Sequence, residues 1–240
     1  MKFYQSKLLN SFANLTHCFT TKQNGNLAFH VNDNPENVLQ NHQELAQKLE
    51  YDLETLVHMK QIHSNRVKIT TQEDNFQNPP TCDALITDKK GTPLMVMVAD
   101  CSPILLYDPK KQVIAVAHAG RAGAFENIVK NVIESFVNDF DSDPENILAS
   151  VGPAICQECY EVGKEIAQEA QKKHLEYAIE EKHDNYYLDI RAILKKQLRE
   201  SGLRENHIEI SPHCSKCDAR FYSYREEKKC GRFAGVIMLR

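Results

Sequence analysis

The sequence has no strong excess of charge, no long apolar run and no tryptophan. Its 240 residues carry a formal net charge of −4, so the chain lacks the basic footprint of a nucleic-acid-binding protein. No apolar run is long enough to cross a bilayer, and the N-terminal residues lack the apolar core of a signal peptide. We therefore expect a cytoplasmic protein that acts on a small-molecule substrate, with neither nucleic acid nor membrane as a partner.

Linkers and internal repeats are also missing. No Gly/Ser-rich segment divides the chain, and 42% of the residues are hydrophobic, which is enough for a sizeable core. We therefore expect one domain over residues 1–240. Strand-like runs neighbour each other too often for a purely alternating β-α-β pattern. This predicts an α/β fold in which packed mixed β-sheets are flanked by helices.

The most informative local pattern is a β-hairpin. Apolar runs at 104–107 and 113–117 flank a polar stretch with turn chemistry, Asp108-Pro-Lys-Lys-Gln112. Cys101 precedes the first strand and His118 follows the second, so we expect both at the open end of the hairpin. Adjacent strands are ~4.8 Å apart, which lets the two side chains reach one ion.

Other apolar patterns predict the remaining elements. Helices are expected over 35–51, 125–140, 162–180 and 189–201, and the second has the clearest amphipathic spacing. A glycine-flanked turn is expected at 120–123. Further strands are expected at 16–22, 56–59, 67–70, 82–87, 94–99, 147–152, 220–224 and 233–239.

Three separated segments each end on a soft metal ligand: His63, Cys101 and His118. Three protein ligands leave one position of a tetrahedral zinc ion open, as in catalytic zinc sites. The alternative is that Cys101 is a small buried hydrophobe and that the histidines are ordinary hydrogen-bonded residues. Asp83 and Asp100 are the carboxylates nearest these ligands in sequence, and both are candidates for acid–base or ligand-orienting roles.

Four of the eight cysteines form two Cys-x-x-Cys pairs, Cys156 with Cys159 and Cys214 with Cys217. This spacing suits a second, closed, structural zinc site. The gap between the pairs is long, so the fold must bring them together. Buried thiols and a redox pair are the alternatives.

Several cations are candidates for binding a substrate. Arg121 lies between an apolar strand and a helical pattern, where backbone N–H groups favour anions. Arg225 follows two tyrosines and precedes Gly231-Arg232, a combination that suits stacking on a base and a guanidinium fork on phosphate. Lys22, after Phe19-Thr-Thr, is a further candidate. Each of these cations also fits an ordinary solvated surface.

Taken together, these segments resemble the laccase-domain family. Its members are described as multicopper polyphenol oxidases, purine nucleoside phosphorylases and peptidoglycan-editing factors. The resemblance runs from about Phe19 to the C-terminus. It rests on the order of these motifs: His17-Cys-Phe-Thr-Thr-Lys22, Gln61-Ile-His-Ser64, Asp83-Ala-Leu-Ile-Thr87, Ala99-Asp-Cys101, Ala117-His-Ala-Gly120, Val151-Gly-Pro153, Tyr160-Glu-Val162, Tyr222-Ser-Tyr-Arg225 and Gly231-Arg232.

The resemblance implies that His63, Cys101 and His118 hold a catalytic zinc ion. It also implies a laccase-domain architecture similar to that of cytotoxic necrotizing factor. The implied reactions are phosphorolysis of adenosine, guanosine, inosine and methylthioadenosine, and deamination of adenosine. Copper chemistry is a weaker expectation, because coupled coppers need more clustered histidines than the ten scattered ones of this chain supply.

Two other functions stay open. The first, implied by the resemblance to peptidoglycan-editing factors, is a cytoplasmic amidase that removes L-serine from a UDP-muramoyl cell-wall precursor, using zinc-activated water or Cys101 as a thiolate nucleophile. The second is a non-enzymatic binding module in which the paired cysteines bind zinc and stabilise the fold.

The chain departs from the family pattern around His118. The family usually reads His-Ala-Gly-Trp-Arg-Gly, whereas here Arg121 takes the tryptophan position and Ala122 takes the arginine position. Lys22 stands where an arginine is usual, and Asn24-Gly25 replaces a Gly-Gly pair. These changes bear on phosphate binding and leave the three metal ligands intact. The paired cysteines exceed the family's usual content.

Overall fold

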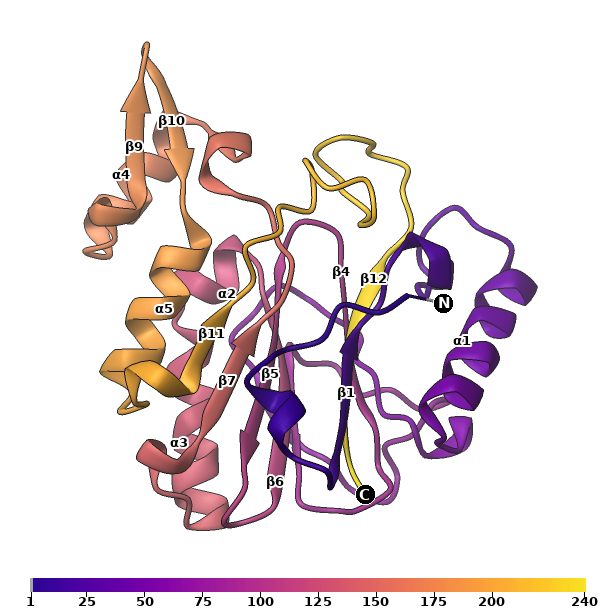
Figure 1. Cartoon of the computed structure of the whole chain (residues 1–240). Coiled ribbons are helices and arrows are strands. Elements are labelled where there is room, and N and C mark those ends of the chain that lie inside the picture. Colours follow the sequence, from indigo (N-terminus) through magenta and orange to yellow (C-terminus); the bar gives the residue numbers. More distant parts are fainter. Residues whose placement is uncertain (1) are drawn as a thin grey trace.

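The computed structural model describes residues 2–240 and arranges them in stacked layers of helix and sheet (Figure 1). The central sheet has six strands in the order β11-β7-β5-β6-β3-β2. Its outer pairs, β11–β7 and β2–β3, are parallel and its inner pairs are antiparallel. In chain order, its strands are β2 (Val67–Ile69), β3 (Ala84–Thr87), β5 (Ser102–Asp108), β6 (Val113–Ala119), β7 (Leu148–Val151) and β11 (Ile208–Ile210).

A second sheet packs against one face of the first. Its order is β1-β12-β4, all antiparallel, with β1 (Leu15–Phe19), β4 (Leu94–Val98) and β12 (Phe233–Leu239). Side chains alternate along a strand, so Leu105 and Tyr107 of β5 pack between the two sheets. Ile104 and Leu106 point to the opposite face, where helices cover the sheet. A small third sheet, β8-β10-β9, consists of β8 (Glu161–Val162), β9 (Ile179–Lys182) and β10 (Asn185–Leu188).

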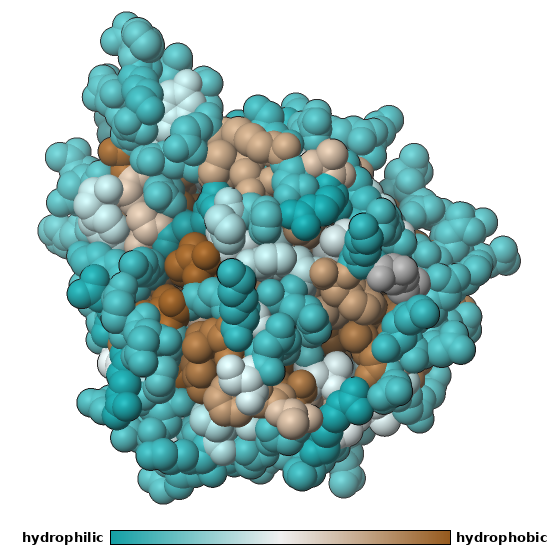
Figure 2. Space-filling view, in the orientation of Figure 1, coloured by the Kyte–Doolittle hydropathy of each residue, from teal (hydrophilic) through white to brown (hydrophobic). Residues whose placement is uncertain are grey.

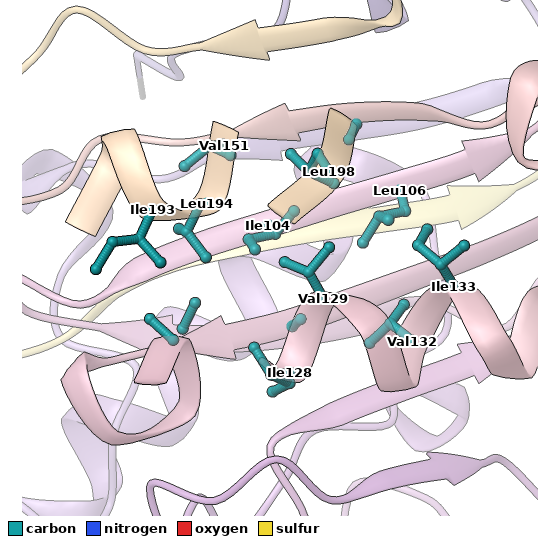
Figure 3. Packing of buried hydrophobic residues seen from close by; sticks show 14 of the residues in the cluster. Ile104, Leu106, Ile128, Val129, Val132, Ile133, Val151, Ile193, Leu194 and Leu198 are labelled. Carbon is teal, nitrogen blue, oxygen red and sulfur yellow. The ribbon is translucent and has the colours of Figure 1, made fainter. Parts of the chain in front are cut away.

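Helices close both outer faces. α3 (Ile128–Phe140) and α5 (Ile190–Glu200) cover the six-stranded sheet, and Figure 3 shows their apolar side chains gathered over Ile104 and Leu106. α1 (Pro35–Leu49) lies on the far side, against the outer face of the three-stranded sheet (Figure 1). α2 (Arg121–Phe125) follows β6 directly, and α4 (Lys164–Lys172) lies beside the small sheet. Short 3-10 turns occur at Leu9–Ser11, Lys22–Asn24, Leu53–Thr55, Pro144–Asn146, Gln157–Cys159, Glu176–Ala178 and Glu205–His207.

The surface is polar where the interior is apolar. Figure 2 shows a face that is mostly hydrophilic, with hydrophobic residues in separate smaller groups. Within residues 2–240, none of the helices combines the length and the apolar character that a bilayer crossing requires.

The structure confirms the predicted mixed α/β fold and the predicted hairpin. β5 and β6 pair antiparallel from Ser102 opposite Ala119 to Asp108 opposite Val113. The turn forms as its composition indicates, because the Asp108 carboxylate accepts hydrogen bonds from the backbone N–H groups of Lys110 and Lys111.

The expected helix over 125–140 and the turn before it need correction. Residues 121–125 already form α2, and the chain breaks before α3 begins at Ile128. Asn127 causes the break: it adopts a left-handed conformation with φ 54° and its side chain accepts a hydrogen bond from Lys130 N. Asparagine tolerates this conformation and caps helices well, so it overrides the continuous apolar spacing.

Three other expectations were also wrong. The helix over 162–180 ends at Lys172, and the chain then forms β9 and β10. Residues 220–224 form turns instead of a strand, because Asp218 accepts hydrogen bonds from the backbone and side chain of Arg220 and bends the chain. Residues 56–59 make a single bridge, from Val57 to Leu94, and are no regular strand.

Buried histidine on α1 makes the fold sensitive to acid. His42 is fully buried and donates from Nε2 to the Leu27 carbonyl at 2.8 Å. Burial lowers the pKa of His42 from 6.5 to about 4, so the folded protein holds it neutral while the unfolded chain binds a proton. Stability is therefore lost as the pH falls from 6.5 toward 4.

We expect this group to lower the free energy of unfolding by about 3 kcal/mol over that interval. Urea denaturation across the interval should show the stability of wild type approaching, then falling below, that of His42→Gln, which keeps a donor for Leu27 but does not titrate. Other titrating groups are common to both proteins and cancel in the difference. Parallel pH profiles would contradict the assignment.

Candidate functional site

The fold brings together the three ligands expected from the sequence. The ligand atoms of His63, Cys101 and His118 all lie within 4.8 Å of one another. Cys101 comes immediately before β5, and His118 belongs to β6, where it pairs with Pro103. β6 extends to Ala119, so His118 lies inside the strand instead of following it, as the hairpin interpretation had expected. His63 arrives from the loop between Lys60 and β2.

Asp83 holds this arrangement together. Its buried carboxylate accepts hydrogen bonds from the backbone N–H groups of Ile62, His63 and Ser64 at 3.3, 3.0 and 2.7 Å, and from Ser64 Oγ at 2.7 Å. It also lies 2.8 Å from His118 Nδ1. These five contacts occupy both carboxylate oxygens. They favour a role in orienting His63 and His118 over a role in proton transfer.

The backbone is strained at two of these positions. His63 has φ 59° and Asp100 has φ 85°, a region that residues other than glycine rarely adopt. The contacts of Asp83 hold the turn at His63 in this conformation. Asp100 is held in the same way: its carboxylate accepts from Ser215 Oγ at 2.7 Å and from Arg225 N at 2.6 Å, and its carbonyl accepts from Ile155 N at 3.0 Å. Strain of this kind is typical of functional sites.

The electrostatics of the cluster favour a charged thiolate. Burial raises the pKa of the Cys101 thiol, but the charges and hydrogen bonds of His118 and His63 outweigh burial and lower it. Burial lowers the pKa of His118, but Cys101 and Asp83 raise it. Burial likewise raises the pKa of Asp83, whose hydrogen bonds to His118 and Ser64 lower it to about 2. The thiolate is the form of cysteine that binds metals.

A cavity of about 1120 Å³ opens onto the three ligands. Four cations line it: Lys60, Arg121, Arg225 and Arg232. Aromatic rings also line it, from Phe29, Phe76, Tyr160 and Tyr224. The cavity is large enough for a ligand of several rings or groups, and its lining combines apolar surface with a few charged groups.

The predicted substrate-binding cations differ in position. Arg225 lines the cavity, lies 5.2 Å over the Tyr160 ring and donates to the Glu161 carbonyl. Arg121 also lines it, but its guanidinium is paired with Glu169 at 2.6 Å. Lys22 is exposed, and its Nζ lies 5.7 Å from the centroid of the Tyr222 ring. Among residues 2–240, it is not one of those that line the cavity.

Sequence reasoning missed His30 and Phe29. Both precede α1 and line the cavity. Burial and the nearby charges of Arg232 and His63 lower the pKa of His30. No local pattern marks this loop, because contacts with distant segments hold it: Leu27 N donates to the Arg232 carbonyl, and His42 of α1 donates to the Leu27 carbonyl.

Comparison with known proteins establishes the family. Residues 16–240 match the family described as multi-copper polyphenol oxidoreductase laccase. The chain belongs to this laccase family. The resemblance inferred from the ordered motifs is therefore confirmed.

Relatives of this laccase-family protein are named purine nucleoside phosphorylases, although the family description refers to polyphenol oxidation. A purine nucleoside phosphorylase of Corynebacterium glutamicum is 36% identical over 231 residues, which cover 92% of this chain and 93% of the relative. One from Streptomyces coelicolor is 34% identical over 214 residues, with 89% and 87% covered.

Solved structures confirm the laccase-like fold. YfiH of Bacillus licheniformis aligns with a TM-score of 0.90 at 28% identity, covering 94% of this chain and 93% of that one. YlmD from Geobacillus stearothermophilus also has a TM-score of 0.90 at 28% identity, with 95% and 93% covered.

The donor set of this family member suits one zinc ion. Two imidazoles and a thiolate are zinc ligands, and three of them leave a fourth position open. Gly120 keeps space beside them, because a Cβ there would lie 2.9 Å from Cys101 Sγ, 3.2 Å from His63 Cδ2 and 3.8 Å from His118 Nε2.

A multicopper centre fits this chain less well. Within residues 2–240, the other group with metal-ligand geometry consists of four cysteines: Cys156, Cys159, Cys214 and Cys217. Three further histidines, His17, His42 and His58, are buried and bond to backbone carbonyls. Coupled coppers need additional clustered imidazoles.

Asp83→Asn tests the orienting role of the carboxylate. An amide keeps one acceptor oxygen, and its NH₂ group cannot accept the hydrogen bonds now made to the other carboxylate oxygen, so we expect zinc affinity to fall ~10- to 100-fold. Competition with a zinc-binding dye measures this affinity.

Asp108→Asn is the matched control for that substitution. Asp108 is a fully buried carboxylate at the opposite end of the same hairpin, so its loss should affect stability and leave zinc affinity unchanged. Equal zinc affinity in wild type and Asp83→Asn would contradict the orienting role.

Proposed function

We propose that the protein is a zinc-dependent purine nucleoside phosphorylase that also deaminates adenosine. The observation that carries the proposal is the open three-ligand cluster of His63, Cys101 and His118 at the base of a cationic, aromatic-lined cavity. Relatives that carry the phosphorylase name support the substrate class. Adenosine, guanosine, inosine and methylthioadenosine are the proposed nucleosides. Copper is the less favoured metal.

The cavity has the groups that a nucleoside and phosphate require. Aromatic rings such as Phe29 and Tyr224 offer surfaces on which a purine can stack. Arg225 and Arg232 offer guanidinium groups that bind phosphate through two parallel hydrogen bonds. Within residues 2–240 both donate to backbone carbonyls and neither is in an ion pair, so their charge is available to an anion.

Arg121 is a weaker phosphate ligand. Its 2.6 Å ion pair with Glu169 of α4 must break before the guanidinium can turn to an anion. The chain has Arg121 where the family usually has tryptophan, so its side chain starts from a different backbone position. We therefore assign phosphate binding to Arg225 and Arg232.

The protein's own groups then arrange the reaction. A zinc ion held by the three ligands would supply a Lewis acid with one open position, suited to orienting an oxyanion or activating water. Asp83 keeps both imidazoles in place while Cys101 contributes negative charge. In phosphorolysis, phosphate held by the arginines attacks the anomeric carbon of the ribose, and the purine leaves as the glycosidic bond breaks. In deamination, water adds to the purine ring and ammonia leaves.

A cytoplasmic location is part of this proposal. All eight cysteines are free, as in a reducing compartment. Nucleosides and phosphate are small molecules of that compartment, so the protein needs neither a nucleic acid nor a membrane partner.

Turnover of purine nucleosides tests the proposal. Inosine with phosphate should give phosphate-dependent release of the base, and adenosine alone should give ammonia. Cys101→Ala and His63→Ala should each lower kcat/KM by at least ~100-fold, because Lewis-acid stabilisation contributes several kcal/mol. Zinc-loaded protein that turns over no purine nucleoside would rule the proposal out.

A second candidate rests on one observation. Asp83 Oδ1 lies 2.8 Å from His118 Nδ1, and His118 lies within 4.8 Å of Cys101 Sγ, so the three follow the acid–base–nucleophile order of a cysteine hydrolase. This order suits an amidase that removes L-serine from a UDP-muramoyl precursor. Incubation with the L-Ser and L-Ala forms should then release L-serine preferentially, and trapping with an alkylating agent should block it. Inertness toward both forms would reject the amidase.

A further inference from the structure

Two distant Cys-x-x-Cys segments lie side by side at one edge of the central sheet. β7 and β11 pair in parallel, so the segments that follow them leave the sheet at the same end. The pairing continues beyond the strands: Ala154 bridges Cys214, and Ser215 N donates to the Ala154 carbonyl at 3.0 Å. Parallel β-pairing thus places Cys156 next to Cys214 although 58 residues separate them.

The four thiols converge on one point. The sulfur atoms of Cys156, Cys159, Cys214 and Cys217 all lie within 4.8 Å of one another. The sulfur atoms of Cys159 and Cys217 lie 3.2 Å apart. Four thiolates ~2.3 Å from a zinc ion lie ~3.8 Å apart at the corners of a tetrahedron, which falls inside this range. A disulfide needs ~2.05 Å, and all four cysteines are free.

The backbone supports negative charge on Cys214. Cys156 N donates to Cys214 Sγ at 3.3 Å. A peptide N–H directed at sulfur stabilises a thiolate more than a thiol, because hydrogen bonds to charged acceptors are stronger. A hydrophobic role explains this arrangement poorly, since Cys217 is exposed and Cys156 and Cys159 are only half-buried.

We propose that Cys156, Cys159, Cys214 and Cys217 bind a structural zinc ion, separate from the open cluster at His63. Four thiolates fill the tetrahedral coordination sphere, so this ion has no free position for a substrate. The ion would crosslink two long loops, the one that follows β7 and the one that follows β11.

The two crosslinked loops contact Asp100, beside Cys101, and contribute residues to the lining of the cavity. Ser215, between the second pair of cysteines, donates from Oγ to the Asp100 carboxylate, and Ile155, beside Cys156, donates from its N–H to the Asp100 carbonyl. Tyr160 follows Cys159 and stacks under Arg225 in the cavity. Asp100 is the strained residue that immediately precedes Cys101. The four-cysteine zinc therefore holds the segments that position Asp100.

Metal analysis of four purified proteins tests this site without any assay of activity. Wild type should contain two zinc ions per chain, and His63→Ala should contain one. Cys217→Ser in the His63→Ala background should contain none. Cys217 is the exposed member of the group, so its replacement by serine disturbs packing least. Cys230→Ser is the matched control, because Cys230 is outside both ligand groups and should leave two zinc ions bound.

Cobalt substitution identifies the ligands. In the His63→Ala background, bound Co²⁺ should show the intense thiolate-to-cobalt charge-transfer absorption of a four-sulfur site, which Cys217→Ser or Cys159→Ser should abolish. Circular dichroism verifies that each variant is folded. Removal of zinc from His63→Ala by a chelator should lower its thermal midpoint and increase proteolytic cleavage within residues 213–232.

Two results would overturn the structural zinc. One is a zinc content of His63→Ala that the addition of Cys217→Ser or Cys159→Ser leaves unchanged. The other is a thiol titration of denatured protein, without reductant, that finds six thiols instead of eight, which would indicate a disulfide. Neither result contradicts the proposed zinc site at His63, Cys101 and His118. That site has its own test, because it would be contradicted if His63→Ala retained all of its zinc.

Discussion

The buried carboxylate of Asp83 is the interaction on which the site depends. A charge without solvent costs several kcal/mol unless hydrogen bonds replace the lost water. Here four donors come from the Ile62–Ser64 turn and a fifth contact from His118, so the same bonds that stabilise the charge also join a loop to the central hairpin. His63 and His118 owe their positions to one group. Loss of its charge would displace both.

A second junction at Asp100 joins the hairpin to the loops that form the cavity. Its backbone and carboxylate contact Ile155, Ser215 and Arg225, which come from two separate segments of the chain. The hairpin thus places Cys101 and His118, a loop bound to Asp83 supplies His63, and further loops supply groups that line the cavity. This division explains how one fold can carry different substrate preferences: the loops can change while the ligand positions stay fixed.

Local patterns predicted part of this structure. The hairpin and α5 could be predicted because turn and capping residues agree with apolar spacing over a short stretch. The break before α3 could not, since Asn127 acts through a conformation that periodicity does not report. The meeting of His63 with Cys101 depends on Asp83, 20 residues away, and residues alone carried no sign of that contact. The order of the family motifs predicted that His63 meets Cys101. Neither a local residue pattern nor a family motif predicted that the loop at His30 lines the cavity.

The two ligand clusters differ in what they permit. The cluster at His63 has three donors and space kept open by Gly120, so it can exchange ligands and take part in chemistry. The four-cysteine cluster, with the structural zinc proposed for it, has no position for a further ligand and acts only by holding its segments together. Ser215 and Ile155 in those segments contact Asp100, which precedes Cys101. The four-cysteine cluster therefore affects the His63 cluster only by fixing the position of Asp100. Because Ala122 stands where the family usually has arginine, the proposed phosphate binding depends more heavily on Arg225. The backbone N–H of Arg225 is bonded to the same Asp100 carboxylate, so the arginine proposed to bind phosphate and the segment that carries Cys101 share one anchor.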